Sequence, residues 1–294
     1  MNFRSVQTVG RLVLYAALLL PLLPGRTLLG QEKQPLNLII LPIDNPRAMY
    51  KSFLPLKRFL EKELQHPVQL TIAQNQDDFM QRCHKNQLDI GFLCPMLYTK
   101  VHYYFGMQPV AKIQENGVAT NTSAIVVRED SPIQALSDLK GKTFVYGQYH
   151  CATSGLLPRY LLLNAGVNED DLLDIGHLGH DESAIYSVMA RLYDAAGVRK
   201  AVAQKYLDKG LRIVEESFPI PQNLFIIRKD LPQDLQERIH RAFMRLNEPE
   251  YLHILKALGE NVDGLVPATD QEYDIIRFLL KTLNNEDYFT SDAE

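Results

Sequence analysis

The chain alternates short apolar segments with segments of helical periodicity, and this alternation narrows the folds that it can adopt. Residues 36–43 are almost wholly apolar, and a segment whose apolar residues recur at helical spacing follows at 53–64. Further segments of strand length lie at 68–73, 88–93, 109–113, 124–128, 143–146, 212–215 and 224–228. Strands and helices that alternate in this way predict an α/β fold, with largely parallel sheets flanked by helices.

Two details of this pattern make specific expectations. Pro55 is expected in the first turn of its helix, because a proline further along would remove a helical hydrogen bond. Beyond residue 230 the chain is expected to be helical, with segments at 233–246, 251–258 and 271–283.

The N-terminus has the pattern of an export signal. Arg4 and Arg11 precede an apolar stretch at 12–23, which is too short to span a bilayer comfortably. We therefore expect a signal peptide at residues 1–30 and a periplasmic or secreted mature protein. An uncleaved membrane anchor stays open, because residues 28–30 form a poor cleavage site; no cysteine follows them, so a lipoprotein anchor is not expected there.

The charge balance argues against one class of partner. The 294 residues carry a formal net charge of −4 and include neither a tryptophan nor a cluster of basic residues. Proteins that bind nucleic acids present basic patches or stripes, so no nucleic-acid partner is expected. Any anion must be bound by local groups rather than by a large positive field.

Three cysteines, Cys83, Cys94 and Cys151, show no metal-site spacing, and neither a metal nor a cofactor is expected. In an oxidising compartment Cys83 and Cys94 could pair, and buried free thiols are an equal alternative. Cys151 follows His150 near a predicted helix start, where a thiol becomes more acidic. No oxyanion partner or cofactor motif accompanies it, so we do not expect an enzyme.

The segment Thr153-Ser154-Gly155 lies between a predicted strand at 143–146 and a predicted helix at 156–164. Hydroxyl groups and unpaired backbone amides at a helix N-terminus form a site for anions, because the helix dipole favours negative charge there. The same residues are also ordinary helix caps, so the motif alone leaves both interpretations open.

The predicted topology indicates where a ligand would lie. In open α/β sheets, ligands bind beyond the carboxyl ends of the strands. Polar loops follow several predicted strands, at 74–78, 95–98, 147–154 and 177–181.

Several motifs occur together in a fixed order: Leu88-Asp89-Ile90-Gly91, residues 123–133, residues 136–142, residues 153–158, Gly179-His180-Asp181, residues 193–197 and Ile220-Pro221. In order and spacing, over about residues 36–260, the chain resembles the substrate-binding proteins of phosphate, phosphite and phosphonate ABC transporters. These proteins have the type II periplasmic-binding-protein fold.

The resemblance implies two α/β lobes that close on a ligand about two crossing strands. The first lobe would comprise residues 35–122 and 222–294, the second residues 123–221. The implied function is capture of a small oxyanion (phosphate, phosphite or a simple phosphonate) for delivery to an ABC permease, by a protein that we expect to be a monomer. The alternative is a sensor subunit that reports ligand occupancy to a membrane receptor or histidine kinase.

The resemblance also implies which residues bind the anion. Thr153, Ser154 and the amide of Gly155 would donate hydrogen bonds, with His180 beside them. The chain departs from the family at Ala152, where the loop has lost its first serine.

Three further candidates stand where relatives use other residues. Gln76 and Asn121 replace tyrosines of phosphonate binders, and Asn223 replaces an acid that holds a substrate amine. An aminoalkylphosphonate is therefore a poor candidate ligand.

Two more candidates have competing interpretations. Asp194 either faces the cleft, where it would accept a hydrogen bond from a protonated oxygen of the ligand, or maintains a turn. Tyr98 either donates its hydroxyl into the cleft or packs with the aromatic residues at 103–105.

Overall fold

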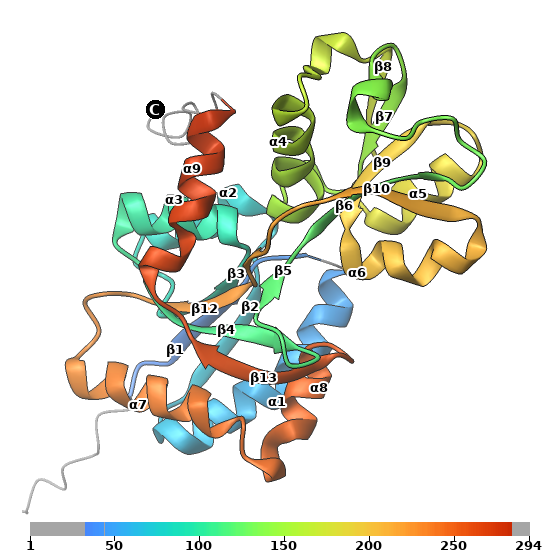
Figure 1. The fold of residues 1–294 in the computed structure, drawn as a ribbon. Helices are drawn as coiled ribbons and strands as arrows, with labels where there is room; N and C mark the ends of the chain where they lie inside the picture. Colours follow the sequence, from blue (N-terminus) through green and yellow to red (C-terminus); the bar gives the residue numbers. More distant parts are fainter. Residues whose placement is uncertain (1–32, 44, 284–294) are drawn as a thin grey trace, which may run out of the picture. The chain divides into compact units, whose positions relative to one another are not determined.

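The computed structural model describes residues 33–43 and 45–283, and the expected signal peptide at 1–30 lies outside them. Two larger β-sheets organise the compact unit that begins at Gln34 (Figure 1). The first sheet has six strands in the order β13-β4-β12-β3-β1-β2. Its strands are β1 (Leu36–Ile40), β2 (Val68–Ile72), β3 (Ile90–Leu93), β4 (Gln108–Glu115), β12 (Leu224–Ile227) and β13 (Val262–Pro267).

The second sheet has five strands in the order β10-β6-β9-β7-β8. They are β6 (Ser123–Arg128), β7 (Thr143–Tyr146), β8 (Asp174–His177), β9 (Ala195–Arg199) and β10 (Leu211–Glu216). A short antiparallel ribbon of β5 (Thr120–Asn121) and β11 (Ile220–Pro221) carries the chain from one sheet to the other and back. This is the two-lobed α/β architecture that the resemblance implied.

The strand directions differ in detail from the sequence-based expectation. Only the pairs β1–β2, β1–β3, β7–β8 and β7–β9 are parallel, whereas β12 runs antiparallel to both of its neighbours and so does β6. Helical crossovers produce the parallel pairs. Strands β6 and β12 are the first to enter a larger sheet after each passage between the sheets, and each runs antiparallel to its neighbours. Both sheets are therefore mixed rather than mostly parallel.

The helices of the first lobe cover both faces of its sheet. They are α1 (Pro46–Leu64), α7 (Gln233–Arg245) and α8 (Leu252–Leu258) on one face, and α2 (Gln76–His84), α3 (Pro95–Phe105) and α9 (Asp274–Thr282) on the other (Figure 1). In the second lobe α4 (Leu157–Asn164), α5 (Asp181–Met189) and α6 (Lys200–Ala203) surround the sheet. Among the described residues, no helix combines the length and the apolarity that a membrane crossing would need.

One expectation about the first lobe was wrong, and another was incomplete. Helix α1 begins at Pro46, where the Asn45 side chain caps it, so Pro55 lies inside the helix. The carbonyl group that Pro55 leaves unbonded belongs to Lys51, which is exposed to water that can take the missing donor's place. The C-terminal region has the three expected helices, but between α8 and α9 it also contains β13, an edge strand that pairs with β4.

The segment before α4 forms a wide π-helical turn at Ala152–Leu156 instead of a regular first turn. The amides of Gly155 and Leu156 both donate to the carbonyl of Cys151, at 3.0 and 3.1 Å. Position 155 must be glycine, because a Cβ there would lie 1.9 Å from the carbonyl oxygen of Tyr149. We call residues 151–156 the ligand turn, because the sequence predicts anion donors within it.

Substituting Gly155 tests this packing. We expect Gly155→Ala to lower the free energy of unfolding by at least about 1–3 kcal/mol, since rigid backbone atoms occupy the space of the new methyl group. Chemical denaturation measures the loss. Gly166→Ala is the control, because only its positive φ of 72° opposes a side chain there; an equal or smaller loss at Gly155 would contradict the close contact.

Candidate functional site

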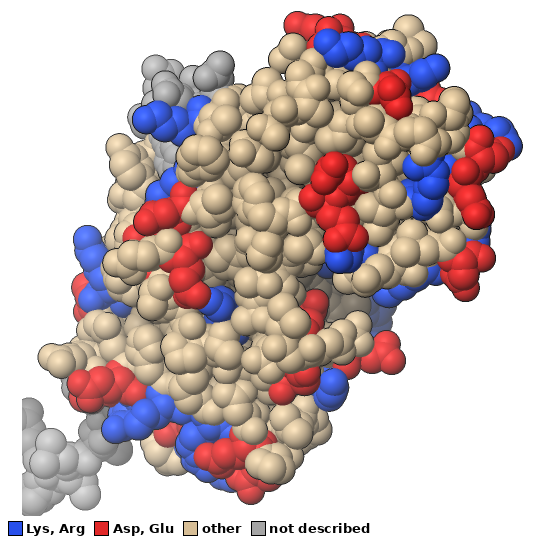
Figure 2. All heavy atoms as spheres, viewed as in Figure 1, with Lys and Arg blue, Asp and Glu red and all other residues tan. Residues whose placement is uncertain are grey.

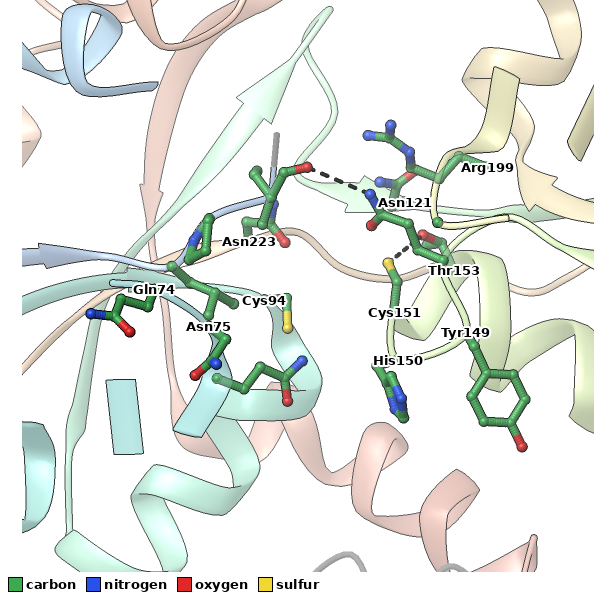
Figure 3. A pocket seen from close by; sticks show the side chains of 16 residues that line it. Gln74, Asn75, Cys94, Asn121, Tyr149, His150, Cys151, Thr153, Arg199 and Asn223 are labelled. Atoms are coloured by element: carbon green, nitrogen blue, oxygen red, sulfur yellow. Dashed lines mark hydrogen bonds between the residues drawn. The ribbon is translucent and has the colours of Figure 1, made fainter. Parts of the chain in front are cut away.

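A cavity of about 410 Å³ lies where the carboxyl ends of strands from both sheets meet (Figure 3). The first lobe contributes the segment after β1, the loop after β2 and Cys94 after β3. The second lobe contributes residues from Gln148 to Thr153, together with Gly179 and Arg199. The side chain of Gln148 donates to the carbonyl of Ile43 at 3.5 Å, a long contact that joins the two walls.

Neutral carboxamides dominate the polar lining of this cavity. They come from the loop after β2, from both connections between the lobes and from the segment after β7: Gln74, Asn75, Gln76, Asn121, Gln148 and Asn223. Each offers two N–H donors and one oxygen acceptor. Among the described residues that line the cavity there is no carboxylate.

Thr153 brings the ligand turn to the cavity wall, where its hydroxyl lies 3.3 Å from the Cys151 sulfur. Beside it, the Ser154 hydroxyl is fully buried and has no hydrogen-bond partner. A buried polar atom without a partner is uncommon in a folded protein and calls for an explanation. The amides of residues 152–154 open the turn, and amides in this position lack a preceding helical carbonyl.

Arg199, the last residue of β9, provides the cationic side chain of the cavity wall. Its Nε donates to Oδ2 of Asp181 at 2.9 Å, and that carboxylate is 2 % exposed whereas the Arg199 side chain is 43 % exposed. Burial lowers the pKa of Arg199, but the pairing with Asp181 outweighs it and raises the pKa above the usual value. Arg199 is therefore always charged, and the buried carboxylate fixes its position.

A glycine makes room for this ion pair. A Cβ on Gly147 would lie 2.2 Å from Oδ1 of Asp181, the carboxylate oxygen that has no partner in the structure. Gly147 follows β7 directly, so the end of this strand packs against the Asp181 carboxylate, which in turn holds Arg199 in the cavity wall.

His150 also lines the cavity, and its charge differs from that of Arg199. Removal from bulk water lowers the pKa of His150 below its usual value, and the nearby Arg159 and His177 lower it further. The imidazole is therefore neutral near pH 7 and can donate or accept one hydrogen bond.

Four of the nine residues predicted from the sequence line the cavity: Thr153, Gln76, Asn121 and Asn223. Ser154 and Gly155 are buried directly behind Thr153, and the Gly155 amide is already bonded to the Cys151 carbonyl. His180 precedes α5 on an exposed position, while its neighbour Gly179 reaches the cavity.

The structure does not bring Asp194 or Tyr98 to the cavity. Asp194 accepts from the amide and the hydroxyl of Thr143, at 2.9 and 3.0 Å, which is the turn role considered as its alternative. It precedes β9, and five steps along an extended chain place it roughly 16 Å from Arg199 at the other end of the strand. Tyr98 is fully buried, donates to Asp270 at 2.7 Å and packs its ring against Tyr273.

Arg199 is the most important residue that the sequence analysis missed. The rule that ligands bind at carboxyl strand ends points to Arg199, the last residue of β9, whereas Asp194 lies at the amino end of the same strand. Cys94 and Cys151 also line the cavity, although neither was predicted to bind the ligand. All three cysteines are free thiols, so Cys83 and Cys94 are not paired. Over residues 33–43 and 45–283, no cluster of three or more metal-ligating side chains is present.

The surface shows no large field of one sign on the face seen in Figure 2, where acidic and basic side chains are intermingled.

A model of the family described as the periplasmic substrate-binding protein of phosphonate ABC transporters matches residues 38–273. The chain belongs to this family. Two curated relatives agree: a phosphonates-binding periplasmic protein of Escherichia coli, 24% identical over 78% of this chain and 71% of the relative, and a phosphate-import protein PhnD of Mycolicibacterium smegmatis, 22% identical over 85% of this chain and 86% of the relative.

Solved structures show the same fold. PhnD1 of Prochlorococcus marinus, in complex with methylphosphonate, has a TM-score of 0.72 and 18% identity, covering 85% of this chain and 98% of its own. XAC2383 of Xanthomonas citri, bound to ATP, has a TM-score of 0.74 and 16% identity, covering 88% and 99%. This phosphonate-family substrate-binding protein is thus a transport component and not an enzyme, which also favours transport over the sensor alternative.

The Arg199–Asp181 pair of this substrate-binding protein can be tested by removing its charges in turn. Arg199→Gln should destabilise the fold by between about 1 kcal/mol, the value of an exposed pair, and about 3–5 kcal/mol, the cost of stranding a buried charge. Adding Asp181→Asn should restore most of that stability, as measured by thermal or urea unfolding. A double variant no more stable than Arg199→Gln alone would show that the pair does not hold the site.

Proposed function

We propose that this protein captures a phosphonate, or the related phosphate or phosphite, in the cavity between its lobes and delivers it to an ABC permease. The observation that carries the proposal is that Thr153 of the ligand turn and the charged Arg199 line one cavity whose described lining holds no carboxylate. A tetrahedral oxyanion presents several acceptor oxygens, and this wall presents donors of hydrogen bonds together with a positive charge.

The hydrogen bonds that this wall can donate are sufficient for micromolar binding of an anion. A hydrogen bond to a charged group contributes roughly 1.5–3 kcal/mol. Four or five of them, from Thr153, the Ser154 hydroxyl, the opening amides of the ligand turn and Arg199, would supply the ~8 kcal/mol of a micromolar site after ordering costs. Ser154 lies behind Thr153, and its hydroxyl would reach the anion when the lobes close, which would give this buried oxygen the partner that it lacks.

The rest of the cavity restricts what the headgroup can carry. A volume of about 410 Å³ falls in the usual range of small-molecule sites and exceeds what one tetrahedral group needs. The carboxamides can bond to a hydroxyl or carbonyl group on a side arm. An ammonium group would find no opposite charge among the described lining residues and would lie in the field of Arg199, so we propose that aminoalkylphosphonates are excluded.

Further parts of the proposal follow the family. We propose that the lobes divide at residues 35–122 with 222–294, and 123–221, and that the protein acts as a monomer without nucleic acid. Residues 1–30 would direct its export, and the anion donors would include His180 once the lobes close about the crossing strands.

Calorimetry with a ligand panel tests the choice of ligand. We expect methylphosphonate, phosphate or phosphite to bind with micromolar or tighter Kd, and 2-aminoethylphosphonate to bind at least about tenfold more weakly than methylphosphonate, a difference of about 1.4 kcal/mol. Preference for the amine would overturn the role of Arg199, and heat from none of the panel would overturn the ligand class.

Removing one hydroxyl tests the ligand turn. Thr153→Val keeps the shape of the side chain, and we expect it to raise the Kd for the best ligand of the panel by about 10- to 100-fold, the worth of one hydrogen bond to a charged group. Thr282→Val, a half-buried position on α9 that does not line the cavity, is the control. An unchanged Kd for Thr153→Val would exclude the hydroxyl from the anion site.

A further inference from the structure

Two thiols from different lobes face the same cavity. Cys94 follows β3 of the first sheet and begins α3, whereas Cys151 begins the ligand turn of the second lobe. Figure 3 shows the two side chains on the two sides of the cavity. Anion binding uses neither of them, because a neutral thiol is only a weak donor.

Packing links the two segments that carry these thiols. Cys94 belongs to the apolar cluster that also contains Ala152, the residue next to Cys151, together with Leu156 and Leu157. The first lobe and the ligand turn are therefore packed against each other at this point. The charge states of the two thiols are also coupled. Burial is the main cause that raises the pKa of Cys94 to about 12, and a negative charge on Cys151 raises this pKa further.

The two thiols differ in accessibility, which assigns them different roles. Cys151 is partly exposed to the cavity, stands at the start of a helical turn and lies 3.3 Å from the Thr153 hydroxyl, so it can meet a reagent from solution. Cys94 is 5 % exposed and cannot. Cys83 is buried within the first lobe and does not line the cavity.

We propose that Cys94 and Cys151 are a dithiol site that forms a disulfide across the ligand cavity when a disulfide reagent reaches it. The Cys151 thiolate attacks one sulfur of the reagent and a thiolate leaves, which produces a mixed disulfide. Cys94 then attacks the Cys151 sulfur, and its proton passes to the departing sulfur, which leaves as the second thiol of the reagent. Two cysteine thiols are oxidised, and one external disulfide is reduced to two thiols.

The bond would connect the ligand turn to the first lobe. A disulfide requires Cα atoms about 4.4–6.8 Å apart, so its formation reports how closely the two walls approach. Its position beside Thr153 places it in the space of the ligand, and the oxidised protein should not bind the anion. Two parts of this inference rest on the proposed function: the loss of anion binding, and export to an oxidising compartment where disulfide reagents are found.

Oxidation of the purified chain with excess oxidised glutathione tests the site. We expect the intact mass to fall by two hydrogens, free thiols to fall from three to one, and a peptide map to join Cys94 to Cys151. Dithiothreitol should reverse the change. Cys83→Ser should behave like the native chain, while Cys94→Ala should stop at the glutathione adduct on Cys151 and Cys151→Ser should keep its thiols.

Three results would overturn the proposal: a Cys83–Cys94 bond, a stable glutathione adduct on Cys151 of the native chain, or no reaction. Because this readout is covalent, it stands even if no anion of the panel binds. If one does bind, it should slow oxidation, and the oxidised protein should lose at least about tenfold in affinity. Oxidation that leaves the affinity unchanged would place the bond outside the ligand site.

Discussion

The close approach of the Tyr149 carbonyl to Gly155 is the constraint on which the binding site depends. It lets the chain fold back over the ligand turn, so that Thr153 reaches the cavity while Ser154 remains buried behind it. With any other residue at position 155 the turn would have to widen, and Thr153 would be displaced from its place in the cavity wall. The absence of a side chain at position 155 thus fixes the position of this proposed anion donor.

The second determinant of the site is the arrangement of charge behind it. Asp181 is removed from water and would be costly to bury alone, so its contact with Arg199 stabilises the fold as well as the position of the guanidinium. The cavity obtains one permanent positive charge without a basic surface. This explains how a chain of net charge −4 can belong to a family of anion binders.

The sequence predicted the architecture better than the site. Apolar runs and helical periodicity located most strands and helices, and β7 was predicted at its observed bounds. Two features set by tertiary contacts were not predictable: β13, which depends on pairing with β4, and the direction of strands after each passage between sheets. Pro55 was misplaced because the true start of α1, at Pro46, has its own cap.

In the site, Thr153 was predictable because a hydroxyl before a helix has a local chemical meaning. The contribution of Arg199 depends on Asp181, eighteen positions away in the chain, and on a strand end, so local motifs could not show it. For Tyr98 the sequence offered a hydroxyl donor, but a distant residue determines where that donor points: the hydroxyl donates to Asp270, 172 positions later, inside the first lobe.

Helix α9 has a consequence for the motion of the lobes. Ile276, Leu279 and Leu280 belong to the same apolar cluster as Leu156 and Leu157, and Tyr160 of α4 contacts Phe278. Helix α9 of the first lobe therefore packs against the segment that carries the proposed anion donors. An opening motion of the lobes would have to pivot about this apolar contact or expose it to water.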